Sequence, residues 1–186
     1  MVWPIFLSLF ITKAEPPNAA TEAEFGKALL ESNIKREKIK LISKCGIQLV
    51  GETRKSNKLK HYNYSKKHIV WSVDQSLKNL KTDYLDLLLL HRPSPLMNPE
   101  EIAEAILYLK EVSKIRAIGV SNFTPSQIAM FEKFIPVSAN QVEFSLTQNN
   151  AMYDGCFDDC IANKRMSMAW SPLGSFFKSD DKQISR

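Results

Sequence analysis

The chain has 186 residues, of which 44% are hydrophobic and 24% are charged, and its formal net charge is +5. This composition suits one globular domain with a sizeable core and argues against an intrinsically disordered chain. The three cysteines, Cys45, Cys156 and Cys160, match no usual zinc-binding spacing. We therefore expect free thiols in a reducing compartment, which favours a cytoplasmic protein.

Residues 1–20 form an atypical apolar N-terminal segment. The apolar run Met1 to Ile11 is too short to span a bilayer as a helix, so we expect no membrane partner. Its first cation, Lys13, follows the run, whereas a secretory signal peptide carries its positive charge before it. The apolar run is therefore either a signal peptide or a strand. As a strand, Val2 to Ile11 could pair with an unpaired edge of the sheet.

The next segment predicts a helix and then a strand. Thr21 to Glu24 has the pattern of a capping box, which opens a helix. In that helix Phe25, Ala28 and Leu29 would share one face. Leu41 to Lys44 then predicts a short strand.

A basic loop follows this strand and contains Tyr62 and Tyr64. Its cations are Arg54, Lys55, Lys58, Lys60, Lys66 and Lys67. Basic residues interleaved with aromatic ones can bind nucleic acid, but a solvated loop is the commoner explanation. We expect no nucleic-acid partner, and a phosphate-bearing cofactor or substrate would also suit this charge.

The clearest strand of the chain is Leu85 to Leu90, a continuous leucine-rich run that reads as a strand buried on both faces. Before it, Ser65 predicts the N-cap of a helix. The buried positions of that helix would be Ile69, Val73, Leu77 and Leu80. His91 falls at the carboxyl end of the strand, where α/β proteins place their chemistry, so it is a candidate site residue.

Helices and strands continue to alternate towards the C-terminus. Asn98 and Thr124 each precede a proline and predict N-caps. The helices after these caps would bury Ile102, Ile106 and Leu109, and then Ile128 and Phe131. The remaining predicted elements are strands at Ile115 to Val120, Ala139 to Phe144 and Met168 to Trp170, and a short helix at Phe157 to Ile161.

Five strands that alternate with helices predict a parallel α/β sheet. Polar residues follow most of these strands, which favours a barrel, because a barrel draws its site from many strand ends whereas an open sheet uses one switch point. These residues are Lys44, His91, Ser121, Asn122, Gln141, Trp170 and Ser171. No Gly-x-Gly-x-x-Gly pattern occurs, so a Rossmann site has no support.

Several ordered segments together resemble the aldo/keto reductases, most of all the bacterial-type oxidoreductases of that superfamily. They are Ile42 to Gly46, Asp83 to Pro93, Lys114 to Phe123, Asn140 to Glu143 and Ala169 to Gly174. The resemblance covers about Thr21 to Gly174. It implies a partial TIM (β/α)8 barrel over residues 21–186, with the third to seventh strands recognisable. It also implies NAD(P)H-dependent reduction of an aldehyde or ketone to an alcohol, with NADPH as cofactor.

The resemblance further implies a role for each site residue. Lys44 and His91 match the family's catalytic Lys and His. Ser121, Asn122 and Gln141 correspond to the residues that hydrogen-bond the nicotinamide carboxamide. Trp170 corresponds to the aromatic ring that lies against the nicotinamide. Ser171 and Leu173 correspond to residues of the loop that passes the pyrophosphate.

The sequence also departs from the family pattern. In the family, an Asp and a proton-donating Tyr lie just upstream of the helix that opens here near Thr21. This chain has no Asp before Asp74 and no Tyr before Tyr62, and we do not expect Tyr62 or Tyr64 to act as a substitute acid. The family's site for the adenosine 2′-phosphate follows an eighth strand, beyond the matched segments.

These departures shape the functional expectation. We expect a truncated barrel with impaired turnover and weak NADPH binding, acting on a small-molecule carbonyl substrate. The strands at Leu41 and Met168 would be open edges that favour self-association. A non-catalytic nucleotide-binding or regulatory barrel, and a truncated gene product without stable function, are the alternatives.

Overall fold

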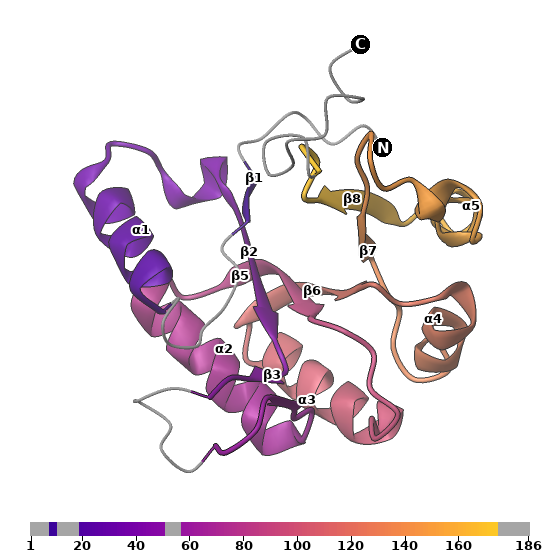
Figure 1. The fold of residues 1–186 in the computed structure, drawn as a ribbon. Coiled ribbons are helices and arrows are strands. Elements are labelled where there is room, and N and C mark those ends of the chain that lie inside the picture. Colours follow the sequence, from indigo (N-terminus) through magenta and orange to yellow (C-terminus); the bar gives the residue numbers. More distant parts are fainter. Residues whose placement is uncertain (1–7, 11–18, 51–56, 175–186) are drawn as a thin grey trace.

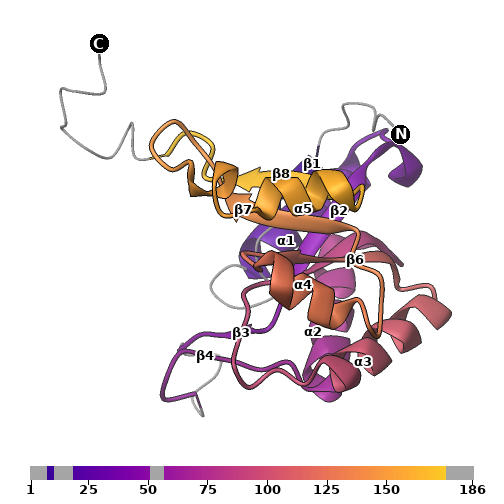
Figure 2. The ribbon, with the colours of Figure 1, turned by 90° about the vertical axis from the view of Figure 1, so that its right-hand side faces the viewer.

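The computed structural model describes residues 8–10, 19–50 and 57–174. Its main sheet is parallel and six-stranded, in the order β1-β2-β5-β6-β7-β8. The strands are β1 Ser8–Phe10, β2 Lys40–Cys45, β5 Leu85–Leu90, β6 Ile115–Ser121, β7 Ala139–Glu143 and β8 Met166–Trp170. The sheet curls into part of a (β/α)8 barrel, and the helices follow its outer side (Figures 1 and 2). The predicted fold class is confirmed.

Five α-helices connect these strands. They are α1 Ala19–Glu31, α2 Lys66–Leu80, α3 Pro99–Glu111, α4 Pro125–Phe131 and α5 Cys156–Ala162, with short 3-10 turns at Arg36–Lys38 and Asn150–Met152. The predicted N-caps of α2, α3 and α4 are confirmed. The Ser65 and Asn98 side chains accept from backbone N–H groups in the first turn, and Thr124 forms a full capping box with Gln127.

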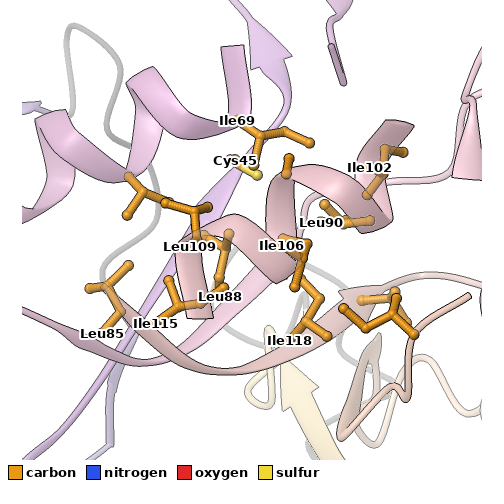
Figure 3. Packing of buried hydrophobic residues seen from close by; sticks show 14 of the residues in the cluster. Cys45, Ile69, Leu85, Leu88, Leu90, Ile102, Ile106, Leu109, Ile115 and Ile118 are labelled. Carbon is orange, nitrogen blue, oxygen red and sulfur yellow. The ribbon is translucent and has the colours of Figure 1, made fainter. Parts of the chain in front are cut away.

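The leucine run of β5 is buried on both faces, as predicted. Leu88 and Leu90 point outward into a large cluster with side chains from α2 and α3 (Figure 3). Leu87 and Leu89 point inward, where they join Met168 and the other residues of a smaller interior cluster. Because both faces are covered, this strand is the centre of the fold and fixes the position of the residue that follows it.

Helix α1 differs from its prediction. It begins at Ala19, so Thr21 lies inside the helix and is not its N-cap, and Glu24 bonds Lys27 instead. Ala28 is exposed, whereas Glu22 and Gly26 are buried. A Cβ at Gly26 would lie 2.2 Å from the Asn79 carbonyl oxygen. The close packing of α1 against α2 therefore decides which residues of α1 face inward. The apolar periodicity of the sequence does not indicate this face.

The N-terminal segment supplies the first strand of the sheet. Within the hypothesised strand Val2 to Ile11, Ser8–Phe10 pairs in parallel with β2, and the rest of that run lies outside the described residues. The prediction of an open edge at Leu41 is therefore wrong, because β1 covers it. Among the described strands, β1 and β8 are the two edges of the sheet.

The basic loop contains an antiparallel pair that the sequence did not predict. β3 Ile47–Gln48 pairs with β4 His61–Tyr62. Two-residue strands are too short to show an alternating pattern, so periodicity in the sequence does not indicate this pair. In the described ranges, none of the helices is long and apolar enough to cross a bilayer.

Candidate functional site

The carboxyl ends of five neighbouring strands carry the predicted site residues. In a parallel sheet, residues paired across strands lie side by side and point to the same face. Lys44 on β2 pairs with the inward-facing Leu89 on β5, so Lys44 also points into the barrel. His91 follows two residues after Leu89. Lys44 and His91 therefore come from adjacent strands at one end of the barrel.

The next two strands contribute a polar pair. Ser121 on β6 pairs with Gln141 on β7, and both side chains are buried. The Gln141 Oε1 atom is enclosed and accepts no hydrogen bond from the described residues. Asn122 has a positive φ of 61° and donates from Nδ2 to the Ser121 hydroxyl over 2.9 Å. Two amides and a hydroxyl thus converge beside β6.

Trp170, at the end of β8, borders the polar group formed by Ser121, Asn122 and Gln141. Its indole Nε1 donates to Asn122 Oδ1 over 2.9 Å, which fixes the half-buried ring against the end of β6. Ser171 and Leu173 lie in the turn after β8, where Ser171 has a positive φ of 53° and Leu173 is exposed. The Ser171 carbonyl accepts from the Gly174 N–H, which closes the turn.

A cavity of about 220 Å³ lies next to this group. Its walls include Arg92, Asn122, Glu143 and Trp170. The Arg92 guanidinium lies 5.7 Å from the centre of the Trp170 ring, a distance at which a cation and an aromatic ring attract. The cavity therefore combines an aromatic wall, an amide, a cation and a carboxylate at the strand ends. Arg92 and Glu143 stand in segments that the sequence singled out, but neither was predicted as a site residue.

Tyr64 holds the backbone that follows His91. Its hydroxyl donates to the Arg92 carbonyl over 2.6 Å and accepts from the Arg92 N–H over 3.1 Å. The ring is buried against Gly46, and burial raises the pKa of Tyr64 above its ordinary value of 10. An acid with a raised pKa and a hydroxyl engaged with backbone is poorly suited to donate a proton to a substrate. Tyr64 is therefore a positioning residue for the end of β5.

Lys44 has an unusual electrostatic environment. Its side chain is 8% exposed, and burial together with the Arg92 guanidinium lowers the pKa of Lys44 from 10.5 to about 8. Within the described residues its ammonium makes no ion pair or hydrogen bond. By contrast, Lys40 on the same strand pairs with Asp86 at 3.0 Å. Lys44 is thus a buried cation whose charge the described residues leave uncompensated.

This burial has a measurable cost. We expect Lys44→Met to raise the free energy of unfolding at pH 7 by up to about 3 kcal/mol, because it removes a buried charge. Below pH 8 Lys44 is charged in both states and the full cost is present. Between pH 8 and 10.5 the unfolded chain binds more protons, so the native chain gains stability with rising pH and the advantage of Lys44→Met shrinks. Urea unfolding at pH 7 and pH 9.5 measures this, and an equal difference at both pH values would contradict it.

Comparison with known proteins places this arrangement in a family. The sequence profile of the Aldo/keto reductase family matches residues 17–185. Uncharacterized oxidoreductase YcsN of Bacillus subtilis is 46% identical, over 87% of this chain and 55% of the relative. Oxidoreductase YdhF of Escherichia coli is 44% identical, over 82% of this chain and 51% of the relative.

The solved structures agree with the sequence relatives. The glycerol dehydrogenase AKR11B4 from Gluconobacter oxydans matches with a TM-score of 0.78 and 26% identity, over 89% of this chain and 50% of that one. The chain thus spans about half the length of the curated relatives that it matches. With a family profile over nearly all of its length and a parallel half-barrel that bears polar strand ends, this chain belongs to the aldo/keto reductase family.

Proposed function

We propose that this chain carries the nicotinamide and carbonyl sites of an NAD(P)H-dependent oxidoreductase that reduces a small aldehyde or ketone to an alcohol. The observation that carries the proposal is the polar pair Ser121 and Gln141 beside the Trp170–Asn122 hydrogen bond. The enclosed Gln141 Oε1 offers an acceptor, and the Ser121 hydroxyl can donate and accept. A carboxamide has two donors and one acceptor, so these residues fit the amide of a nicotinamide. Ser171 and Leu173 would then border the pyrophosphate.

The other residues have distinct roles in this proposal. A bound NADPH would supply the hydride. Lys44 and His91 lie at the end of the barrel where, in this proposal, the substrate oxygen gains negative charge, and a cation or an N–H donor there stabilises that charge. Tyr64, which adjoins them, has a raised pKa and a hydroxyl that is held by the Arg92 backbone, so it is poorly suited to act as the acid. We therefore propose that hydride transfer by this chain alone is slow, because the described residues place no suitable acid to protonate the substrate oxygen.

Tryptophan fluorescence tests the cofactor site. We expect NADPH to quench the purified chain saturably, and Trp170→Phe to abolish most of the quenching because Trp170 lies against the proposed nicotinamide position. Gln141→Ala should weaken binding about 5- to 30-fold, since it removes a buried hydrogen-bond partner. A parallel titration with NADH reports which nicotinamide cofactor the chain prefers.

Two matched controls sharpen this experiment. Trp71→Phe removes an exposed tryptophan on α2 and should leave the quenching unchanged. Gln75→Ala removes an amide from the same helix, away from the strand ends, and should leave the affinity unchanged. A folded, soluble chain whose fluorescence does not respond to either cofactor would overturn the proposed function. The chain would then have the fold of the family without its cofactor site.

The proposal extends to the setting of the chain. All three cysteines are buried, and within the described residues Cys156 and Cys160 form no disulfide, which suits a reducing compartment and hence the cytoplasm. Among the described strands, β8 has an unpaired edge through which copies could associate. We further propose that residues 21–186 act as one barrel domain, preceded by the segment 1–20 that supplies β1.

A further inference from the structure

Lys44 has the environment of a nucleophilic amine. It is a buried lysine at a strand end, it faces the barrel interior, and its ammonium has no ion-pair partner within the described ranges. A second cation, Arg92, lies just after the neighbouring strand β5 and acts on Lys44 electrostatically. Burial and a neighbouring cation are the two conditions that activate a lysine towards carbonyl compounds.

The free base is accessible at ordinary pH. Because the pKa of Lys44 is lowered to about 8, about half of these amines carry a lone pair at pH 8. An exposed lysine with a pKa near 10.5 is almost fully protonated there. The difference in the amount of neutral amine exceeds about a hundredfold, while the lower basicity and the burial of Lys44 each reduce its reactivity. The inference requires the gain in neutral amine to exceed these two losses, and the relative propylation rates of the lysines measure that balance.

We propose that Lys44 forms a Schiff base with a small aldehyde that enters the barrel end beside His91. The Nζ lone pair forms a bond to the carbonyl carbon, and the C=O π electrons move to oxygen to give an alkoxide that takes up the proton lost by nitrogen. The resulting carbinolamine expels its hydroxyl group as water after protonation, and the nitrogen lone pair forms the C=N bond. Hydrolysis reverses the sequence, so no oxidant or reductant takes part. This inference shares with the proposed function the entry of a carbonyl compound beside Lys44 and His91, and it needs no cofactor.

Reductive trapping tests the inference. The full chain is incubated at pH 8 with propionaldehyde and sodium cyanoborohydride, and peptide mass spectrometry measures propylation at each lysine over time. We expect Lys44 to be propylated at least about threefold faster than the exposed Lys78 on α2 and than Lys40. Equal or slower propylation of Lys44 in the folded chain would overturn the inference. This comparison is made within the unchanged protein, so it does not depend on whether a variant folds.

Two variants complete the test. Lys44→Arg keeps the charge but cannot form an imine, and it should remove the fast phase of propylation. Lys40→Arg keeps the ion pair with Asp86 on the same strand and should leave the fast phase unchanged. A fast phase that survives Lys44→Arg would assign the reactivity to another residue and overturn the inference. Because no cofactor is added, fast propylation without NADPH quenching would contradict the proposed cofactor site alone, and quenching without fast propylation would contradict the Schiff base alone.

Discussion

Gly46→Ala is expected to destabilise the chain by about 2–5 kcal/mol and to disturb the end of β5. Gly46 has a φ of 110°, which costs an alanine about 1–2 kcal/mol. A Cβ at this position would also lie 2.1 Å from the Tyr64 Cε1 atom, so the ring must move. Overpacking of this kind typically costs a further 1–3 kcal/mol, roughly.

The displacement of Tyr64 links this cost to the site. The Tyr64 hydroxyl bonds both the N–H and the carbonyl of Arg92, next to His91. When the ring moves, these two hydrogen bonds are lost, and the backbone that orients His91 and Arg92 is released. We therefore expect the propylation of Lys44 to slow in Gly46→Ala even where the variant stays folded, because Arg92 no longer holds its place near Lys44.

Matched variants separate backbone strain from the clash. Gly155 also has a positive φ, 82°, but a Cβ there would meet only the Pro125 Cγ atom at 3.7 Å. Gly155→Ala should therefore cost about 1 kcal/mol. When Tyr64 is also replaced by alanine, the clash is absent, so Gly46→Ala should then lower the stability by about as much as Gly155→Ala does, about 1 kcal/mol. Urea unfolding of the four variants gives these differences, and equal costs for the two glycines would show that Tyr64 does not restrict position 46.

The place of the candidate site residues in the fold was largely predictable from the sequence, because it depends on the barrel topology. The leucine run of β5 defines a strand buried on both faces, and its end fixes His91. The alternation of strands with capped helices then places Lys44, Ser121, Gln141 and Trp170 at the same end of the sheet. Local signals and a simple topological rule were sufficient for this level of detail.

Contacts between residues distant in sequence were not predictable. Glu22 lies in a helix where only apolar residues were expected inside, yet it is buried and accepts hydrogen bonds from the Ser43 and Ser76 hydroxyls. Burial raises its pKa, and these hydroxyls partly oppose that shift. Tyr64 likewise depends on the distant Arg92 backbone. No spacing in the sequence indicates which polar side chain will find such a partner.

Arg165 is another buried polar residue that the sequence did not single out, although its removal should have the largest effect on stability. Its side chain is 2% exposed and lies just before β8. It donates to both carboxylate oxygens of Glu132, to Asp159 Oδ2 at 2.9 Å and to the Val137 carbonyl at 2.9 Å. One guanidinium thus connects the end of α4, the segment leading to β7, and α5.

We expect Arg165→Met to lower the free energy of unfolding by about 3–5 kcal/mol, because it removes the guanidinium that donates to two carboxylates and a buried carbonyl. Lys114→Met is the matched control. It removes an ion pair in which the Lys114 Nζ and Asp74 Oδ1 atoms lie 2.6 Å apart and the two side chains are 33% and 43% exposed, and it should cost less than about 1 kcal/mol. Urea unfolding at pH 7 measures both, and equal effects would show that the Arg165 network adds nothing beyond a surface pair.

The acid dependence gives an independent check on the same network. Hydrogen bonds from Arg165 lower the pKa of Glu132 below its ordinary value of 4.5. The native chain therefore binds fewer protons than the unfolded chain around this pH, so the contribution of the pair is complete above pH 4.5 and is lost as the pH falls through the folded-state pKa. The stability difference between the unchanged chain and Arg165→Met should narrow with acidification. Since Arg165 directly precedes the strand that carries Trp170, the variant should also lose NADPH quenching at urea concentrations where Lys114→Met still retains it.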